Sequence, residues 1–397
     1  MVSISAPSIG DASAVRPEPL RLGYVIDTLL TGGAERLVLT FAEVVRNRDD
    51  VDLTVFVLSD LRTPFYEALE ALGTEIVTLP GRNLVDMGRF ARLIGALRAH
   101  RIEHVHAHLA SSTTIGAFAA RALGIPFVTT IHNVRPSVRR IRTGRKFLQW
   151  AALRLPGVKV IAVGKAVADA MKGRNCVVVP NAVSETVVAP RGAREAVRAS
   201  LNLSDDAPVL VCVGTIIGQK AHNVLLDSFA LVRQRNDKAQ LLIVGDARDP
   251  ERQALLEQQA AMLKITDSLH FLGMRRDIPD ILAASDLFVS SSDWEGAPVS
   301  LLEAMANGLP AVVTDVGEND LVLRQTGAVL VPIQDPQALA EGILSLIDDP
   351  EKRSDVAQAV QQRALSEYGA EAWVNRLLDF YADTGRRRDW RDGGRTT

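Results

Sequence analysis

Two glutamates eight residues apart, Glu295 and Glu303, stand in the most informative part of the sequence, residues 286–314. A short apolar run opens this segment and reads as a buried strand. Pro298 then begins a helical pattern that ends at Gly308, the usual order of these two residues around a helix. The loop and first helical turn offer free backbone N–H groups to an anion such as phosphate. Two carboxylates beside an anion site suit a ligand that carries hydroxyls and phosphate, such as a nucleotide sugar.

The spacing of the two acids is weak evidence alone, because a capped surface helix with solvated glutamates has the same pattern. The whole string is more specific. It resembles the donor-site signature of the retaining glycosyltransferases of family 4. The matching residues are Glu295, Gly296, Pro298, Leu302, Glu303, Ala304, Met305, Gly308, Leu309 and Pro310.

The resemblance implies a role for each part of this segment. Glu303 is expected to accept hydrogen bonds from ribose hydroxyls, and Glu295 to hold hydroxyls of the transferred sugar. The donor would be a UDP- or GDP-linked sugar, with no cofactor and no metal. The backbone that meets the sugar and phosphate comprises Gly296, Ala297, Pro298, Val299 and Ser300.

Composition limits the class of protein. The chain has 397 residues, 47% of them hydrophobic, which is enough for two domains with real cores. A net charge of −2 argues against nucleic acid as a partner. The two cysteines, Cys176 and Cys212, read as buried core residues of a reducing compartment. No apolar stretch is long enough to span a bilayer, so we expect a cytoplasmic protein, working at the inner face of the membrane if it meets one.

Strand and helix patterns alternate along nearly the whole chain, which predicts an α/β protein with parallel sheets covered on both faces. The strands fall into two series of similar length. We therefore expect two doubly wound domains that face each other across a cleft. Ligands of such domains bind at the carboxyl ends of the strands. The family resemblance gives this arrangement its name, the GT-B fold with two Rossmann-like domains. Expected strands are Leu22–Asp27, Leu53–Leu58, Glu75–Leu79, His104–His108, Pro126–Ile131, Lys159–Val163 and Cys176–Val179 in the first half, and Val209–Gly214, Ala239–Gly245, Leu269–Gly273 and three runs from residue 287 to 332 in the second.

The domain limits follow from breaks in this pattern. The boundary falls in Pro180–Pro208, where proline, serine and charged residues interrupt the alternation. The last helical pattern has Trp373, Leu377 and Phe380 at core spacing. In the resembled family a final helix crosses back to the first domain, while a terminal helix on its own domain is the plain alternative. The expected division is a leader (1–20), an acceptor domain (21–185), a donor domain (186–365), a crossover helix (366–384) and a polar tail (385–397).

Two further loops match parts of the family's cleft. Gly32 and Gly33 allow a tight turn and close approach to a ligand, although a glycine pair before a helix is often only a turn. Lys220 follows a strand end and would balance the charge of a diphosphate. The alternative is an ordinary solvent-exposed lysine without a role in binding. The family usually has an arginine five residues before this lysine. This chain has Thr215 at that position. Half of the expected cationic clamp is therefore missing, unless Arg275 or its neighbour Arg276 compensates.

Histidines gather in the first half. His132 ends a strand and resembles the family's first-domain histidine, which reaches toward the donor sugar; a structural histidine is the alternative. His104, His106 and His108 alternate on one strand and share a face. Zinc binding is a remote alternative for these three, and we expect instead that their strand end lines the cleft. Asn181 resembles a family element at the hinge.

A basic run from Arg135 to Lys146 is flanked by Phe147, Leu148 and Trp150. Such a run is usually a solvated face, but a basic amphipathic patch also holds proteins on anionic membrane surfaces. This second use suits a lipid-linked acceptor; an oligosaccharide acceptor is the alternative.

Together these features predict a metal-independent retaining hexosyltransferase that serves surface polysaccharide or glycolipid synthesis. The resemblance implies that its catalytic residues are Glu295, His132 and Lys220. The sequence shows no neighbouring acid and base pair that would define an inverting mechanism. Positioning and charge stabilisation would carry most of the rate. Three alternatives remain: a sugar-nucleotide epimerase of the same fold, a two-lobed solute-binding protein, and a non-catalytic nucleotide-binding subunit.

Overall fold

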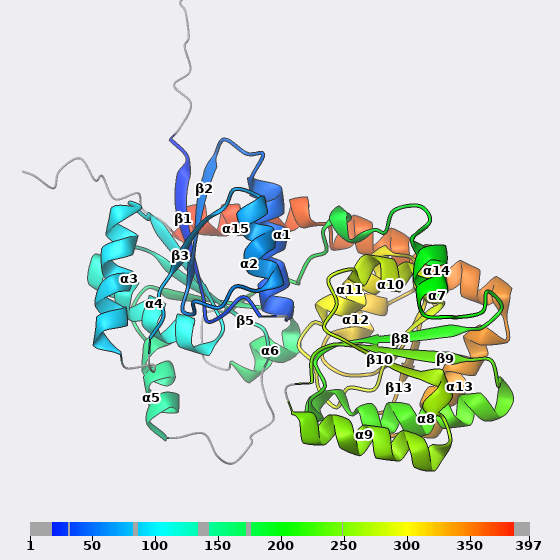
Figure 1. Cartoon of the computed structure of the whole chain (residues 1–397). Coiled ribbons are helices and arrows are strands. Elements are labelled where there is room, and N and C mark those ends of the chain that lie inside the picture. Colours follow the sequence, from blue (N-terminus) through cyan, green and yellow to red (C-terminus); the bar gives the residue numbers. More distant parts are fainter. Residues whose placement is uncertain are drawn as a thin grey trace, which may run out of the picture.

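The computed structural model describes residues 18–384 except 31, 82–85, 134–142, 172–175 and 248, with the backbone alone at 143, 145 and 146. Two parallel sheets organise this part of the chain and stand side by side in Figure 1. Residues 1–17 of the expected leader, the tail and residues 135–142 of the basic run lie outside the described residues.

The first sheet has seven parallel strands in the order β3-β2-β1-β4-β5-β6-β7. The central strands are largely buried because helices cover both faces of the sheet, whereas the outer strands β3 and β7 are partly exposed. The strands are β1 (Leu20–Ile26), β2 (Val51–Val57), β3 (Glu75–Thr78), β4 (His104–His108), β5 (Phe127–Ile131), β6 (Val158–Ala162) and β7 (Cys176–Val178). The helices between them are α1 (Gly33–Val45), α2 (Pro64–Ala71), α3 (Met87–Ala99), α4 (Ala110–Leu123), α5 (Thr143–Ala152) and α6 (Lys165–Ala170).

The second sheet repeats this plan with six parallel strands in the order β10-β9-β8-β11-β12-β13. They are β8 (Val209–Val213), β9 (Gln240–Val244), β10 (Leu269–Gly273), β11 (Leu287–Ser290), β12 (Ala311–Thr314) and β13 (Val329–Val331). The helices are α7 (Ala193–Ser200), α8 (His222–Arg235), α9 (Pro250–Leu263), α10 (Ile278–Ala284), α11 (Val299–Ala306), α12 (Asn319–Leu323), α13 (Pro336–Ile347), α14 (Pro350–Glu367) and α15 (Ala370–Thr384), with 3-10 turns at Glu185–Val187 (η1), Gly218–Lys220 (η2) and Thr266–Ser268 (η3).

The strand orders locate the ligand-binding edge. In each sheet the order reverses between the first strand and the fourth, at β1/β4 and at β8/β11. Ligands of doubly wound sheets bind outside the carboxyl ends of the strands at this reversal. The loops after β1, β4, β8 and β11 are therefore the ones that position a site. The expected strands all exist, with ends that agree or differ by at most two residues, and the doubly wound α/β fold is confirmed.

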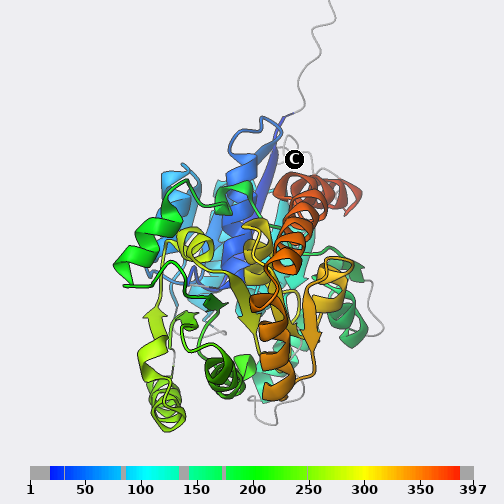
Figure 2. The same cartoon turned by 90° about the vertical axis from the view of Figure 1, so that its right-hand side faces the viewer.

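The last helix returns to the first sheet. In Figure 1 the red α15 lies beside α1, whereas the preceding α14 lies on the second sheet. Figure 2 shows this orange-to-red segment along one side of the molecule, with the C-terminal end at the first sheet. Trp373, Leu377 and Tyr381 are buried in the first sheet's core, and the Trp373 ring meets Phe41 edge-on at 6.1 Å. Phe380, which was expected in the core, is only partly buried. The next residue, Tyr381, is buried instead.

The cysteine prediction is half right. Cys212 is buried in the second core, whereas Cys176 on the outer strand β7 is half-buried, and both are free thiols. Within the described ranges no helix is long and apolar enough to cross a membrane.

Candidate active site between the two sheets

The loops at the β8/β11 reversal bring Glu295 and Lys220 together. Lys220 Nζ lies 2.6 Å from Glu295 Oε1, although 75 residues separate the two in sequence. The Ser292 hydroxyl donates to the same oxygen at 2.7 Å, and Gln219 Nε2 donates to Oε2 at 3.2 Å. The Glu295 side chain is only 8% exposed. Three donors thus hold a nearly buried carboxylate, and charge-assisted bonds of this kind fix its orientation.

Two uncapped helix N-termini meet beside this carboxylate. Neither Pro298, before α11, nor Gly32, before α1, caps its helix with a side-chain hydrogen bond. A Cβ added at Gly33 would lie 3.2 Å from Cγ2 of Val299, which shows how closely the two helices approach. Both N-termini carry positive dipole ends, and together they favour an anion at the border of the two sheets.

Glu303 lies one turn into α11 and faces α1. Its Oε1 is 3.1 Å from Nε of Arg36, and both side chains are less than a fifth exposed. Burial raises the pKa of Glu303, while the nearby Arg36 guanidinium opposes that rise. Arg36 therefore neutralises a carboxylate whose charge would otherwise be costly in this position.

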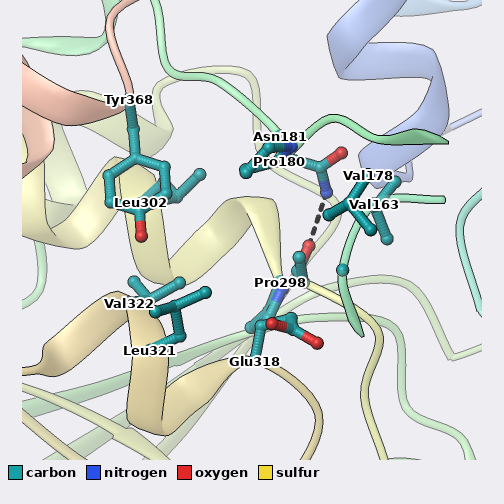
Figure 3. A pocket seen from close by; sticks show the side chains of 12 residues that line it. Val163, Val178, Pro180, Asn181, Pro298, Leu302, Glu318, Leu321, Val322 and Tyr368 are labelled. Carbon is teal, nitrogen blue, oxygen red and sulfur yellow. Dashed lines mark hydrogen bonds between the residues drawn. The ribbon is translucent and has the colours of Figure 1, made fainter. Parts of the chain in front are cut away.

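Gly296 forms the tightest contact between the two halves. A Cβ built at this position would lie only 2.0 Å from the carbonyl oxygen of His132, so no larger residue fits without a shift of the backbone. The neighbouring Ala297 carbonyl accepts a 2.6 Å hydrogen bond from Nδ2 of Asn181 (Figure 3). Glu318 N donates to the Gly296 oxygen at 3.0 Å, and its carboxylate accepts from the Ala166 N–H of α6 at 2.9 Å. The loop is thus held on both sides of the border.

Figure 3 also shows a small pocket behind this loop. It is mostly apolar and is closed by the Asn181–Ala297 bond. Its lining comes from β7 and the segments after β6 and β7 in the first half, and from α11, α12 and the residues that flank α11, α12 and α14 in the second: Val163, Gly164, Val178, Pro180, Asn181, Ala297, Pro298, Leu302, Glu318, Leu321, Val322 and Tyr368.

His132 follows β5 and reaches the same border. Its Nε2 lies 3.0 Å from Nδ1 of His108, and the two rings stack at 5.2 Å. Burial lowers the pKa of His132 to about 4, so its ring is neutral at pH 7. The other two strand histidines point elsewhere: His104 bonds to Thr384 and His106 to the hydroxyls of Tyr381 and Thr130.

The expectation was that the end of β4 lines the cleft. The residue at that end, His108, contacts His132, whereas His104 and His106, farther back on the strand, contact α15. They share a face as expected, but that face is covered by the last helix. Within the part of the chain that the structure describes, no three histidine, cysteine or acidic side chains form a metal-binding group.

Known proteins share this architecture. A family model described as "Glycosyltransferase Family 4" matches residues 31–187, and one described as "Glycosyl transferases group 1" matches residues 193–363. The chain belongs to glycosyltransferase family 4. The resemblance seen in the donor-site string is thus confirmed over both halves, and the epimerase, solute-binding and non-catalytic alternatives are not favoured.

Individual relatives of this glycosyltransferase match most of its length. The Escherichia coli protein named UDP-Gal:alpha-D-GlcNAc-diphosphoundecaprenol alpha-1,3-galactosyltransferase is 24% identical over 381 residues, which are 92% of this chain and 97% of the relative. The putative glycosyltransferase EpsF of Bacillus subtilis is 26% identical and covers 74% of this chain and 79% of its own. The crystal structure of Anabaena HepE in complex with UDP-glucose superposes with a TM-score of 0.82 at 21% identity, over 91% of this chain and 99% of that one. This last likeness establishes the GT-B fold.

The arginines that were expected to replace the missing cation are engaged elsewhere. Arg275 is paired with Asp277 two residues on, through a 2.8 Å bond from Nε. Arg276 reaches Glu67 of α2 at 2.8 Å, across the border of the two sheets. Thr215 follows β8 as expected and is half-buried. Instead, Arg36 is the arginine that the structure brings to the donor-site helix.

Sequence reasoning also missed Gln219, Ser292 and His108 as partners of the expected site residues. Gln219 and Ser292 are near neighbours of Lys220 and Glu295 in sequence, so their positions were a usable signal. The Arg36–Glu303 pair had no such signal, because it joins residues from different domains.

Helix α5 carries the flank of the basic run. Phe147 is 62% exposed and Trp150 is 49% exposed, with their rings stacked at 5.7 Å. The Arg154 guanidinium lies 4.0 Å from the centroid of the Trp150 ring. Large exposed aromatic side chains beside a cation are unusual on a surface that meets only water.

Proposed function

We propose that this glycosyltransferase moves a hexose from a nucleotide-sugar donor to a lipid-linked or saccharide acceptor with retention of configuration. The observation that carries the proposal is the Lys220–Glu295 pair beside the facing N-termini of α1 and α11. A diphosphate needs positive charge and N–H donors, and a sugar needs acceptors for its hydroxyls. These groups occur together at the strand-order reversal, where such ligands bind.

The residues take the following roles in the proposal. Glu303 accepts bonds from the ribose hydroxyls, and Arg36 keeps that carboxylate charged although burial raises its pKa. The N–H groups of Gly296, Ala297, Val299 and Ser300, with those at Gly32 and Gly33 opposite, surround the phosphates. Glu295 holds hydroxyls of the sugar, its geometry being fixed by Lys220.

Lys220 also balances the charge that forms on the leaving diphosphate. When the bond between the sugar's anomeric carbon and the phosphate oxygen breaks, both electrons stay on that oxygen. The oxygen then accepts the proton of the acceptor hydroxyl as the new glycosidic bond forms on the same face of the sugar. Electrostatic stabilisation and alignment supply most of the rate in this scheme, so a charged side chain at the diphosphate matters more than a separate base.

We infer a uridine nucleotide as the donor's leaving group, with guanosine as the alternative. HepE is described in complex with UDP and UDP-glucose, and the galactosyltransferase relative is named for UDP-Gal. The same relative is named for a diphosphoundecaprenol-linked acceptor, and another for lipopolysaccharide core biosynthesis. Surface polysaccharide or glycolipid synthesis at the cytoplasmic face of a membrane is the setting that these relatives favour.

A peripheral membrane contact fits that setting. Phe147 and Trp150 present aromatic rings beside Arg154, the combination that inserts at the headgroup level of anionic bilayers. We propose α5 as the membrane-facing element, since a lipid-linked acceptor would then enter the cleft from the same side of the chain. Binding to anionic vesicles, compared with a Phe147→Ser, Trp150→Ser variant, tests this separately from turnover.

Thermal unfolding with UDP, GDP and ADP tests the donor site. A nucleotide at a hundred times its Kd stabilises the folded protein by about 2.7 kcal/mol, which is readily seen as a rise in Tm. We expect this rise with UDP, and expect Glu303→Ala to reduce it. Product stereochemistry by NMR then tests retention. If no nucleotide raises the Tm, the proposed donor site is wrong; an inverted product would contradict retention alone.

A further inference from the structure

His108 reaches the site through its contact with His132. It is the last residue of β4 and is fully buried. Its Nδ1 lies 3.0 Å from Nε2 of His132, and the stacked rings are inclined by only 27°. This contact occupies one of the two ring nitrogens of His132, so Nδ1 of His132 is the one left for a ligand.

A column of rings behind His108 holds it in place. The centroid of the His106 ring, on the same strand face, lies 4.4 Å from that of the His108 ring, and the centroid of the Tyr24 ring lies 5.2 Å from it. His106 is itself held through both nitrogens, by Tyr381 at 2.6 Å and Thr130 at 2.7 Å. The column therefore connects α15 to the histidine that faces the cleft.

Both members of the contact are neutral at pH 7, because burial lowers the pKa of His108 well below 6.5 and that of His132 to about 4. One ring must then donate an N–H and the other must accept it. The second nitrogen of His108, Nε2, is buried and has no hydrogen-bond partner among the described residues. If His132 donated, His108 would carry an unpaired buried N–H at Nε2. If His108 donates, only a lone pair is left there, and orphaned buried N–H groups are the rarer case in proteins.

We propose that His108 is a positioning residue for sugar transfer: its Nδ1–H donates to Nε2 of His132, which fixes His132 as the tautomer that presents Nδ1–H to the cleft. The catalytic part of this inference rests on the proposed function. A neutral N–H at that place donates a hydrogen bond to an oxygen of the bound sugar and cannot accept one. His132 thereby orients the sugar without withdrawing a proton from it.

NMR of the full chain labelled with ¹⁵N-histidine tests the tautomer without any ligand. The seven histidines are few enough to resolve, and the His132→Gln variant identifies the signal of His132. We expect the proton of His132 on Nδ1. A proton on Nε2 in the unmodified protein would overturn the proposal, whatever the activity.

Two substitutions at His108 then separate donation from packing. His108→Asn keeps an N–H donor near the position of Nδ1, whereas His108→Leu keeps only the bulk. We expect the asparagine variant to preserve the Nδ1–H form of His132 and the leucine variant to lose it. His104→Leu is the matched control, since His104 is equally buried on the same strand face but bonds to Thr384 and not to His132.

Turnover of the donor gives the second readout. We expect His108→Leu to lower kcat by about tenfold, the effect of one hydrogen bond, and His108→Asn to recover most of that loss. The Tm rise caused by UDP should be the same in both variants, because the nucleotide is held elsewhere. Equal kcat in His108→Leu and the unmodified protein would overturn the positioning role. Absence of the UDP effect in the unmodified protein would instead contradict the proposed function, and the NMR result would still decide the tautomer.

Discussion

Gly296→Ala is the substitution whose effect the structure defines best. The added Cβ would lie 2.0 Å from the His132 carbonyl oxygen, whereas such carbon atoms do not approach heavy atoms closer than about 3.0 Å in real proteins. The loop must therefore move by about 1 Å away from the first sheet. The atom that blocks it belongs to the backbone, so no side-chain rotation relieves the contact.

The expected cost follows from where the loop lies. Gly296 stands next to Glu295 and three residues before the first residue of α11, so the displacement moves the carboxylate and the helix N-terminus together. A misplacement of about 1 Å in a catalytic constellation lowers the rate by about 10²-fold. We therefore expect kcat/KM for donor turnover to fall by about two orders of magnitude, while the folded protein loses about 1–3 kcal/mol of stability through overpacking.

Two other glycines provide matched controls. A Cβ at Gly95, in the middle of α3, meets nothing within 4 Å, so Gly95→Ala should gain up to about 1 kcal/mol of helix stability and leave turnover unchanged. At Gly33 the nearest atom is Cγ2 of Val299 at 3.2 Å, which needs to give by only a few tenths of an ångström, so Gly33→Ala should give an intermediate loss. Steady-state kinetics and thermal unfolding of the three variants are the measurements. A Gly296→Ala enzyme within about threefold of the unmodified kcat/KM would refute the reasoning.

Three further outcomes concern stability. Lys264, which ends α9 with φ 59°, is exposed in the left-handed region that favours glycine, so Lys264→Gly should stabilise the fold by about 0.5–1 kcal/mol in urea unfolding; a loss would contradict the strain argument. Tyr381→Phe removes a buried hydroxyl that bonds to Tyr24 and His106, and should cost about 1–3 kcal/mol in the same assay; an unchanged midpoint would show that the two partners find other bonds. Burial lowers the pKa of His104 to about 4, so the folded state binds fewer protons than the unfolded state between pH 6.5 and 4. Its contribution to stability is therefore complete above pH 6.5 and declines by up to about 3 kcal/mol as the pH falls to 4, and His104→Gln should flatten the measured decline.

The sequence was sufficient for features that depend on local pattern. Strands alternating with helices required parallel sheets, and the ends of β8 and β11 had to meet at one edge, where Lys220 and Glu295 lie together. Glycine and proline set the limits of α11, and the structure begins that helix at Val299, directly after Pro298.

Features that depend on the placement of one domain against the other were not accessible in the same way. Arg36 faces Glu303 only because α1 and α11 meet across the border, and no periodicity within either segment encodes that meeting. Likewise, the histidines of β4 share one face as the strand period requires, but which element covers that face depends on α15. Arg275 was a candidate for the missing cation of the donor site because of its charge. It forms an ion pair with Asp277, two residues away, instead.

The return of α15 to the first sheet has a consequence for synthesis of the chain. Trp373, Val374, Leu377 and Tyr381 complete a core whose other members were made before residue 183, apart from Val299. At about 5–20 residues per second, a ribosome needs roughly 10–40 s to make the intervening stretch of about 190 residues. During that time the face of α1 and the buried histidines of β4 have no cover from α15. We therefore expect the first domain to mature last although it is translated first, and a nascent chain stalled before Ala370 to be a client for chaperones that bind exposed apolar surface.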